Sequence, residues 1–398
     1  MIQGMYAALN WKGDQHLYQK EERDACLERI DWEELCAYAS SLNDNRPCCL
    51  LDRWTAGGVH LIKLLEFAGT DTQWVARVQI EPSTAETTTI LRAEIAAMEL
   101  VHARAALGVP VPKIFGYELD DANPVRAAFM LMEFLPGSSA MDADGGYEVH
   151  RGQIQVERRS GFYHEMAHIQ VHLSSIRLPT IGTVVKHPDG TFGVGPLPGL
   201  GGPFSTATEF FIASAKHAKF PLTDDQIRRC TEGGGWTEQI LDSINAFPSR
   251  LRALARRISR CDNGPFPLYH PDLYQSNVIV DDSYQVLGVI DWEGACSVPW
   301  EVVQPPLFLN VLPRAMDDPD NYAVDGQPKN GDTLQRLADR DEYARYVRDA
   351  EHELKTDHSL STTLLDPAVQ GLAYAIKVYL DPGKMGFYCN VLEPFASG

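Results

Sequence analysis

One polar segment between two short apolar runs constrains this 398-residue chain more than any other feature. His270, Asp272 and Asn277 stand in the spacing H-x-D-x4-N directly before the run VIV, and Asp291 follows a second run, GVI. Two β-branched runs separated by a short polar stretch favour an antiparallel hairpin. We therefore expect Asp272, Asn277 and Asp291 to lie close together at the end of that hairpin.

The types of these residues suit one kind of chemistry. Two carboxylates and an amide offer the oxygen ligands that a hard cation such as Mg²⁺ prefers. One carboxylate remains to accept a proton from an attacking hydroxyl group. Because phosphoryl transfer depends mainly on positioning and on neutralising charge with a metal ion, the segment favours that reaction.

The chain before residue 135 is predicted to be α+β. An amphipathic helix is expected at 19–42, and three strands should follow between 48 and 80, joined by turns at 57–58 and 69–71. A second helix at 87–107 and two further strands complete the region. These elements predict a five-stranded antiparallel sheet with a helix.

The remainder is predicted to be mainly helical. Helices are expected at 160–177, 206–218 and 237–260, and two or three more should finish the chain. The Gly- and Pro-rich stretch at 186–203 should be a loop or hairpin, and the acidic tract at 316–332 a surface loop.

From residue 54 to residue 300, the sequence resembles the aminoglycoside phosphotransferase/choline kinase family, and especially its divergent fungal members. This family is the small-molecule branch of the protein-kinase-like fold. The resemblance implies a bilobal fold, with a nucleotide-binding N-lobe at 1–134 and a larger C-lobe at 135–398 that holds the catalytic loop, the metal site and substrate-binding helices. It also implies ATP and Mg²⁺ as cofactors of a small-molecule kinase.

The resemblance assigns roles to the residues of the polar segment. Asp272 would be the catalytic base, and His270 the supporting histidine of the catalytic loop. Asn277 and Asp291 would be the magnesium ligands. The expected activity is ATP-dependent O-phosphotransfer to a hydroxyl group of a small molecule.

The resemblance also assigns the nucleotide-binding residues of the first lobe. Gly57 and Gly58 would form the turn over the ATP phosphates. Arg77 takes the place of the phosphate-binding lysine on the third strand, and Glu94 is its partner on the helix. The segment MLMEFLPG would be the hinge, with the backbones of Glu133 and Leu135 near the adenine.

Two positions depart from the family pattern. Pro271 replaces the usual glycine between His270 and Asp272, which restricts the preceding residue and removes an N–H group. Arg77 keeps the positive charge of lysine but presents it as a planar fork. A catalytically silent nucleotide-binding protein stays open as an alternative, as does a repurposed enzyme that transfers another group, because a fold does not determine a function.

A second motif points to different chemistry. His164, Glu165 and His168 spell H-E-x-x-H on a predicted helix, which is typical of zinc metalloproteases. The extended motif would need glycine at 171 and histidine at 174, where the chain has Val171 and Ser174. No later helix offers a persuasive E-x-x-x-D pair of ligands. We therefore interpret the segment as a packed helix of the second lobe.

The spacing after Asp291 favours a small-molecule acceptor. Pro299 follows only eight residues later, which leaves no room for the long activation segment with which protein kinases hold a peptide. A hydroxylated small molecule is the expected acceptor. The acidic tract at 316–332 is interpreted first as a solvated loop, and attraction of a cationic acceptor is the alternative.

Charge and composition exclude several other classes of partner. The chain has 35 Lys and Arg against 54 Asp and Glu, a net charge of −19, which disfavours binding to nucleic acid or to an anionic membrane. No stretch approaches the roughly 18 uninterrupted apolar residues of a membrane span. Residues 1–15 lack the basic and then apolar pattern of a signal peptide, so we expect a cytoplasmic protein. The identity of the acceptor and the oligomeric state stay open.

Overall fold

The computed structural model of the chain describes residues 20–232 and 235–396. Packing divides the chain into a first unit, which runs to Phe162 and includes Leu273–Gly294, and a second unit formed by Tyr163–Asp272 and the residues from Ala295 onward. The predicted boundary between residues 134 and 135 stays a prediction, because dense packing does not show which segments fold on their own. The opening residues, for which we expect no signal peptide, lie outside the described residues.

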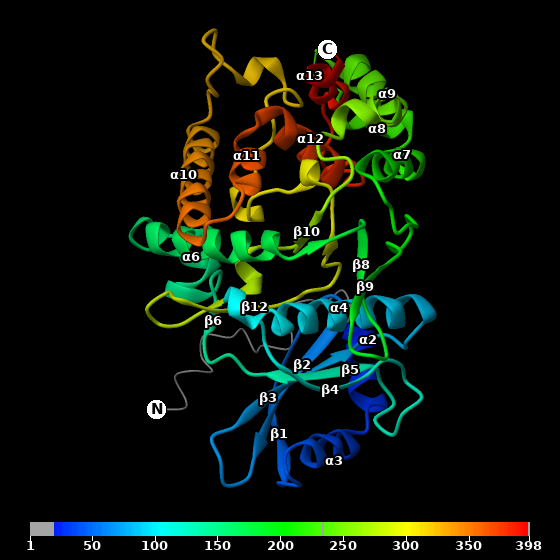
Figure 1. Ribbon diagram of the computed structural model, residues 1–398, viewed down its shortest axis with the longest axis vertical. Coiled ribbons are helices and arrows are strands. Elements are labelled where there is room, and N and C mark those ends of the chain that lie inside the picture. Colours follow the sequence, from blue (N-terminus) through cyan, green and yellow to red (C-terminus); the bar gives the residue numbers. More distant parts are fainter. Residues whose placement is uncertain (1–19, 233–234, 397–398) are drawn as a thin grey trace. The chain divides into compact units, whose positions relative to one another are not determined.

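A five-stranded antiparallel sheet forms the centre of the first unit (Figure 1). Its spatial order is β1-β2-β3-β5-β4, and each neighbouring pair is antiparallel. This arrangement confirms the predicted α+β class and the predicted turns after the first two strands. The strands are β1 (Cys48–Ala56), β2 (His60–Phe67), β3 (Gln73–Gln79), β4 (Ile114–Glu118) and β5 (Phe129–Glu133).

Two helices stand where one was expected at 19–42, so that prediction was wrong. The chain forms α2 (Lys20–Arg29) and α3 (Trp32–Leu42), and residue 19 lies outside the described residues. Asp31 interrupts the helical pattern because its backbone is extended, with φ −85° and ψ 94°. Its carboxylate accepts the N–H of Glu34 at 3.1 Å and so caps the start of a new helix.

The two faces of the sheet bury different kinds of residue. Leu61, Leu65 and Trp74 belong to a buried apolar core that also includes Leu35 and other residues of α2 and α3. The residues that alternate with them along the strands, among them Arg77, line a cavity. Because successive side chains of a strand point to opposite faces, this alternation gives the sheet a packed face and a cavity face.

The helix expected at 87–107 is α4 (Ala85–Ala103). It starts two residues earlier because Thr84 and Thr87 form a reciprocal capping box. It ends earlier because the chain leaves the α-helical backbone at Arg104 and makes a short 3₁₀ turn at Ala105–Leu107. This helix carries Glu94.

The polar segment near residue 280 forms the expected hairpin. Strands β11 (Val278–Val280) and β12 (Val286–Val289) pair antiparallel, with Val278 opposite Val289. The short strand β6 (Ser138–Ser139) adds to the other side of β11, and α5 (Tyr147–His150) follows it in the chain.

The second unit is mainly helical, as predicted, with a small five-stranded sheet in the order β7-β10-β13-β8-β9. The helix α6 (Val156–Ser175) begins in the first unit and ends in the second. The stretch at 186–203 contains the second strand of a hairpin, which agrees with the prediction. The strands are β7 (Arg177–Leu178), β8 (Gly182–Lys186), β9 (Phe192–Gly195), β10 (Phe266–Tyr269) and β13 (Cys296–Ser297).

The helices α7 and α9 follow the predicted ranges closely, α8 was not expected, and four helices of the described residues, not the expected two or three, follow the acidic tract. The acidic tract at 316–332 is largely irregular, with one 3₁₀ turn at Pro319–Asn321. The helices are α7 (Ala207–His217), α8 (Asp224–Cys230), α9 (Thr237–Ile258), α10 (Gly331–Leu354), α11 (Ser359–Leu365), α12 (Pro367–Val378) and α13 (Glu393–Ala396).

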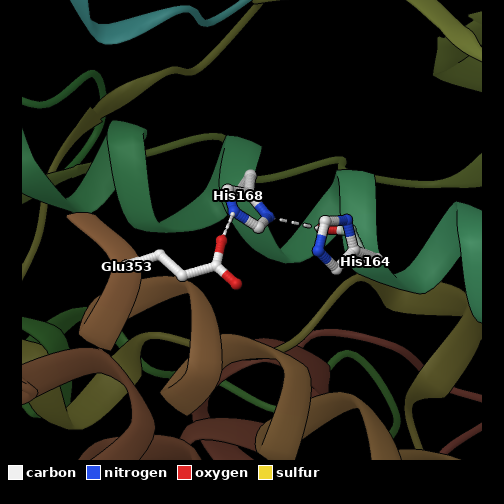
Figure 2. Close-up of side chains that lie close together, drawn as sticks. All are labelled: His164, His168 and Glu353. Carbon is white, nitrogen blue, oxygen red and sulfur yellow. Dashed lines mark hydrogen bonds and ion pairs between the residues drawn. The ribbon is translucent and has the colours of Figure 1, made fainter.

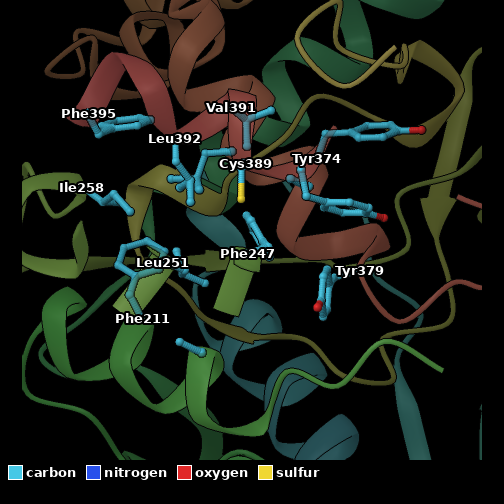
Figure 3. Close-up of a cluster of buried hydrophobic side chains, with 14 of the residues drawn as sticks. Phe211, Phe247, Leu251, Ile258, Tyr374, Tyr379, Cys389, Val391, Leu392 and Phe395 are labelled. Atoms are coloured by element: carbon cyan, nitrogen blue, oxygen red, sulfur yellow. The ribbon is translucent and has the colours of Figure 1, made fainter. Parts of the chain in front are cut away.

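An aromatic core holds the helices of the second unit together (Figure 3). Phe247 of α9 packs against Tyr379 and Tyr388, with ring centroids 5.1 and 5.4 Å apart. The hydroxyl of Tyr379 donates to the carbonyl of Ile244 at 2.8 Å, so this buried polar group is satisfied.

Among the helices of residues 20–232 and 235–396, none combines the length and apolar character that crossing a bilayer requires.

Tyr343 offers a test of how α10 is held against α6. Its hydroxyl is fully buried and donates to Oε1 of Gln170 at 2.8 Å. We expect Tyr343→Phe to lower the free energy of unfolding by about 1–3 kcal/mol, because it leaves a buried acceptor without its donor. The control is Tyr346→Phe on the same helix, which should change it by less than about 0.5 kcal/mol. Chemical denaturation of both variants measures the difference, and equal losses would contradict the account.

Candidate active site

A cavity of about 400 Å³ opens on the face of the first unit's sheet away from α2 and α3. Its walls combine apolar strand residues with polar groups from the glycine turn and the β11–β12 hairpin. The cavity brings together seven of the residues predicted from the sequence: Gly57, Gly58, Arg77, Glu133, Leu135, Asn277 and Asp291.

Arg77 is the centre of the polar side of this cavity. Its side chain is only 8% exposed, and one terminal nitrogen lies 2.6 Å from the carboxylate of Glu94, which is 2% exposed. The other terminal nitrogen lies 3.0 Å from Oδ1 of Asp291 and 3.8 Å from Oε2 of Glu293. A planar guanidinium can bind two carboxylates in this way, which a single ammonium group does less specifically. Arg77 thus joins β3, α4 and the turn after β12.

The charges of this cluster do not balance, since one guanidinium faces three carboxyl groups. Burial alone would lower the pKa of Arg77, but Glu94 and Asp291 outweigh it and raise that pKa. Burial raises the pKa of the Glu293 carboxyl, with Arg77 opposing the shift. Glu293 was not predicted, and the sequence signal was its place two residues after Asp291 in the segment D-W-E.

Local backbone structure fixes the direction of Asp291. Its φ is 61°, in the left-handed region that aspartate tolerates better than most residues. The next residue, Trp292, is fully buried, and its indole N–H donates to the carbonyl of Val289 at 2.9 Å. This anchor holds the turn, while the Asp291 side chain stays 42% exposed.

Asn277 lies beside Asp291 through the pairing of the hairpin. The N–H of Ile290 donates to the carbonyl of Asn277 at 2.9 Å, and both Asn277 and Asp291 line the cavity. Asn277 is 9% exposed. The pairing therefore brings together the two residues that were predicted as metal ligands, by a contact that the sequence pattern favours.

The glycine turn leaves open space at the other side of the cavity. The N–H of Gly57 donates to the carbonyl of His60 at 3.0 Å, which closes the turn between β1 and β2. A Cβ added to Gly57 or Gly58 would meet nothing within 4 Å, so crowding within the protein does not require glycine there. Burial, helped by the charge of Arg77, lowers the pKa of His60 to about 3, so this imidazole is neutral at physiological pH.

His270 and Asp272 belong to the second unit, where they follow β10. His270 is 2% exposed, and its Nδ1 accepts the N–H of Asp272 at 3.2 Å, while the Asp272 side chain is exposed. Lys377 of α12 donates from Nζ to the carbonyl of Pro271 at 2.8 Å. Burial lowers the pKa of Lys377, and the nearby Asp272 opposes that shift. Lys377 was not predicted, because it stands more than a hundred residues later in the sequence.

The Arg77–Glu94 pair yields a stability prediction. Arg77→Met should lower the free energy of unfolding by about 3–5 kcal/mol, because it leaves the buried Glu94 carboxylate without its partner. The double variant Arg77→Met/Glu94→Met should recover most of that loss, since no buried charge remains in the pair. A denaturation double-mutant cycle measures the coupling, and additive losses would contradict the account.

Comparison with known proteins gives one family match and several more distant likenesses. The sequence matches the Phosphotransferase enzyme family over residues 66–300, which is more than half of the chain. It is 24% identical over 287 residues to altered inheritance of mitochondria protein 9, mitochondrial, of Saccharomyces cerevisiae, across 58% of this chain and 44% of that protein. The protein of the same name from Zygosaccharomyces rouxii is 28% identical over 95 residues, across 24% of this chain and 15% of that protein. The chain thus spans less than half the length of these curated relatives.

Solved structures of phosphotransferases align along most of the chain at low similarity. Macrolide 2'-phosphotransferase type I aligns at 13% identity and a TM-score of 0.41, covering 93% of this chain and 99% of that one. Ethanolamine kinase of Plasmodium vivax aligns at 11% identity and a TM-score of 0.42, covering 96% of each chain. The match over residues 66–300 shows by itself that this chain belongs to the Phosphotransferase enzyme family.

Proposed function

We propose that this protein is an ATP-dependent O-phosphotransferase that acts on a hydroxyl group of a small molecule. One observation carries the proposal: the Arg77–Glu94–Asp291 network lies in a cavity that also contains the glycine turn and Asn277. Family membership supports the reaction class. The cavity supports a site for the nucleotide.

The two sides of the cavity suit the two parts of ATP. Apolar strand residues, among them Ile62, Leu64 and Val75, offer a surface for a flat heterocycle. The backbones of Glu133 and Leu135 would hold the edge of the adenine. The open space over Gly57 and Gly58 would let the phosphates approach the backbone closely, next to the guanidinium of Arg77.

The donor set fits a magnesium ion. Asn277 and Asp291 offer a carboxamide and a carboxylate oxygen, which hard divalent cations prefer, and both line the cavity at the end of one hairpin, where Ile290, the residue before Asp291, donates to the carbonyl of Asn277. The excess of carboxyl groups around Arg77 would also favour an added positive charge. When bound, Mg²⁺ would neutralise phosphate charge and orient the γ-phosphate.

Asp272 is the proposed catalytic base. It would accept the proton of the acceptor hydroxyl as that oxygen forms a bond to the γ-phosphorus, while the bond to the β-phosphate oxygen breaks and ADP leaves. His270 would hold the loop through its hydrogen bond with the Asp272 N–H. Lys377 would stabilise the same loop, since it binds the carbonyl of the proline between these two residues.

Product mass distinguishes the proposal from its alternatives. A phosphotransferase adds one phosphate to its acceptor, whereas an enzyme that transfers another part of the nucleotide adds a larger mass. A catalytically silent protein yields no modified product.

We propose a hydroxylated acceptor of the aminoglycoside or amino-alcohol type, because the acidic tract at 316–332 would attract a cation. We also propose a cytoplasmic location, with the mitochondrion named for the yeast relative as the alternative.

Asp272→Asn tests the catalytic base. It should lower the rate of phosphate transfer by about 10²- to 10⁴-fold, because an amide cannot accept the hydroxyl proton. Nucleotide affinity should stay nearly unchanged. Asp282→Asn, an exposed carboxylate in the β11–β12 turn, is the matched control and should keep full activity. Mass spectrometry of acceptor products measures the rates, and undiminished turnover in Asp272→Asn would contradict the mechanism.

Asp291→Asn tests the metal site. In the unchanged protein, ATP with Mg²⁺ at a hundredfold excess over its Kd should add about 2.7 kcal/mol of stability and raise the melting temperature by a few degrees. Chelating the metal should remove most of this rise. In Asp291→Asn the rise should be largely lost even with Mg²⁺, because a charged ligand is missing, while asparagine still tolerates the left-handed backbone. Equal rises in both proteins would argue against Asp291 as a ligand.

A further inference from the structure

Two histidines of α6 and one glutamate of α10 converge within the second unit (Figure 2). His164 and His168 stand on successive turns of α6, and their ring centroids are 4.4 Å apart. Glu353 reaches them from the last turn of α10, with Oε2 3.0 Å from Nε2 of His168. One ligand atom of each residue lies within 4.8 Å of the other two. None of these residues belongs to the proposed phosphotransfer site.

The hydrogen bonding of His168 sets the role of its second nitrogen. Nδ1 lies 2.9 Å from the carbonyl of His164, and a carbonyl only accepts, so Nδ1 carries the proton. In the neutral ring, Nε2 then presents a lone pair toward the Glu353 carboxylate. Two electron-rich atoms 3.0 Å apart need a positive charge between them or beside them. Either a second proton on His168 or a metal ion can supply it.

The donor set and its spacing favour a metal ion of a particular class. Ligand atoms about 2.0–2.1 Å from a tetrahedral zinc ion lie roughly 3.3 Å from one another. The nitrogen–oxygen distance in His168–Glu353 already approaches that value. His164 is exposed and the Glu353 side chain is 62% exposed, so both can rotate to close the remaining gap. Two imidazoles and one carboxylate suit Zn²⁺ and similar transition metals better than Mg²⁺ or Ca²⁺.

We propose that His164, His168 and Glu353 form a site for Zn²⁺ that links α6 to α10. The carbonyl of His164 accepts the Nδ1–H of His168 and would fix the tautomer and the orientation of that ring. Metal-bound histidines commonly make such a hydrogen bond through the ring nitrogen that does not bind the metal. The ion holds the last turn of α10 against α6. Tyr343, about ten residues earlier in α10, makes a separate attachment to α6 through its hydrogen bond to Gln170. A water molecule completes the four-coordinate shell.

The sequence motif alone could not support this site. His164 and His168 provide two ligands, and the third comes from a residue 185 positions after His168. The fold supplies that third ligand through the packing of α10 on α6. The proposal is a metal-binding site that links two helices, and it is independent of the nucleotide site.

The test uses the full chain without an affinity tag. Zn²⁺ is titrated against a chromogenic chelator, and the bound metal is counted per chain. We expect one ion per chain. Loss of a residue that only hydrogen-bonds to a zinc ligand already weakens metal binding about 10- to 100-fold. Loss of a ligand itself, in His164→Ala, His168→Ala or Glu353→Gln, should therefore weaken zinc binding on the order of 100-fold. The matched control is His172→Ala, one turn further along α6, which should change the affinity by less than about threefold.

A second readout separates metal binding from a simple ion pair. Co²⁺ in place of Zn²⁺ should give a visible absorption band in the unchanged protein and in His172→Ala, and the band should be absent from the three ligand variants. The melting temperature with MgATP should be the same in the unchanged protein, the three ligand variants and His172→Ala, which establishes that each of them is folded. Equal zinc affinity in the unchanged protein and the ligand variants would overturn the proposal. So would the absence of any bound zinc, which would leave His168 and Glu353 as an ion pair only.

Discussion

The buried guanidinium of Arg77 is the interaction on which the candidate site depends. Glu94 and Asp291 stand 17 and 214 positions away in the sequence, and Arg77 holds them together. A buried ion without a partner is costly, so each member of the network stabilises the position of the others. The strand β3, the helix α4 and the turn after β12 are thereby fixed around one side of the cavity, where the phosphates of a nucleotide would lie.

The pleat of the sheet makes that arrangement possible. Trp74, Ala76 and Val78 of β3 enter the core beneath α2 and α3, while Val75 and Arg77 line the cavity. A shift of one residue in the register would exchange the two sets and place the arginine in the apolar core. The same strand therefore supplies both the packing that stabilises the sheet and the cation of the site.

Features set by local sequence were predictable, and contacts across the chain were not. The strands, their turns and the β11–β12 hairpin follow from apolar runs and glycine, which act over a few residues. The break at Asp31 was missed because capping overrode a helical pattern. Lys377 and Glu353 were missed because only tertiary packing brings them to Pro271 and His168. Glu293 was missed although it stands next to the predicted segment, since its contact with the buried arginine depends on the turn that Trp292 anchors.

The most direct test of the proposed nucleotide site is a crystal structure of the chain with Mg²⁺ and a nonhydrolysable ATP analogue. We expect the adenine against the backbones of Glu133 and Leu135, the phosphates between the glycine turn and Arg77, and the metal ion on Asn277 and Asp291. An analogue bound elsewhere, with the Arg77 network untouched, would contradict the proposed nucleotide site. A cavity that stays empty at millimolar nucleotide would contradict it as well.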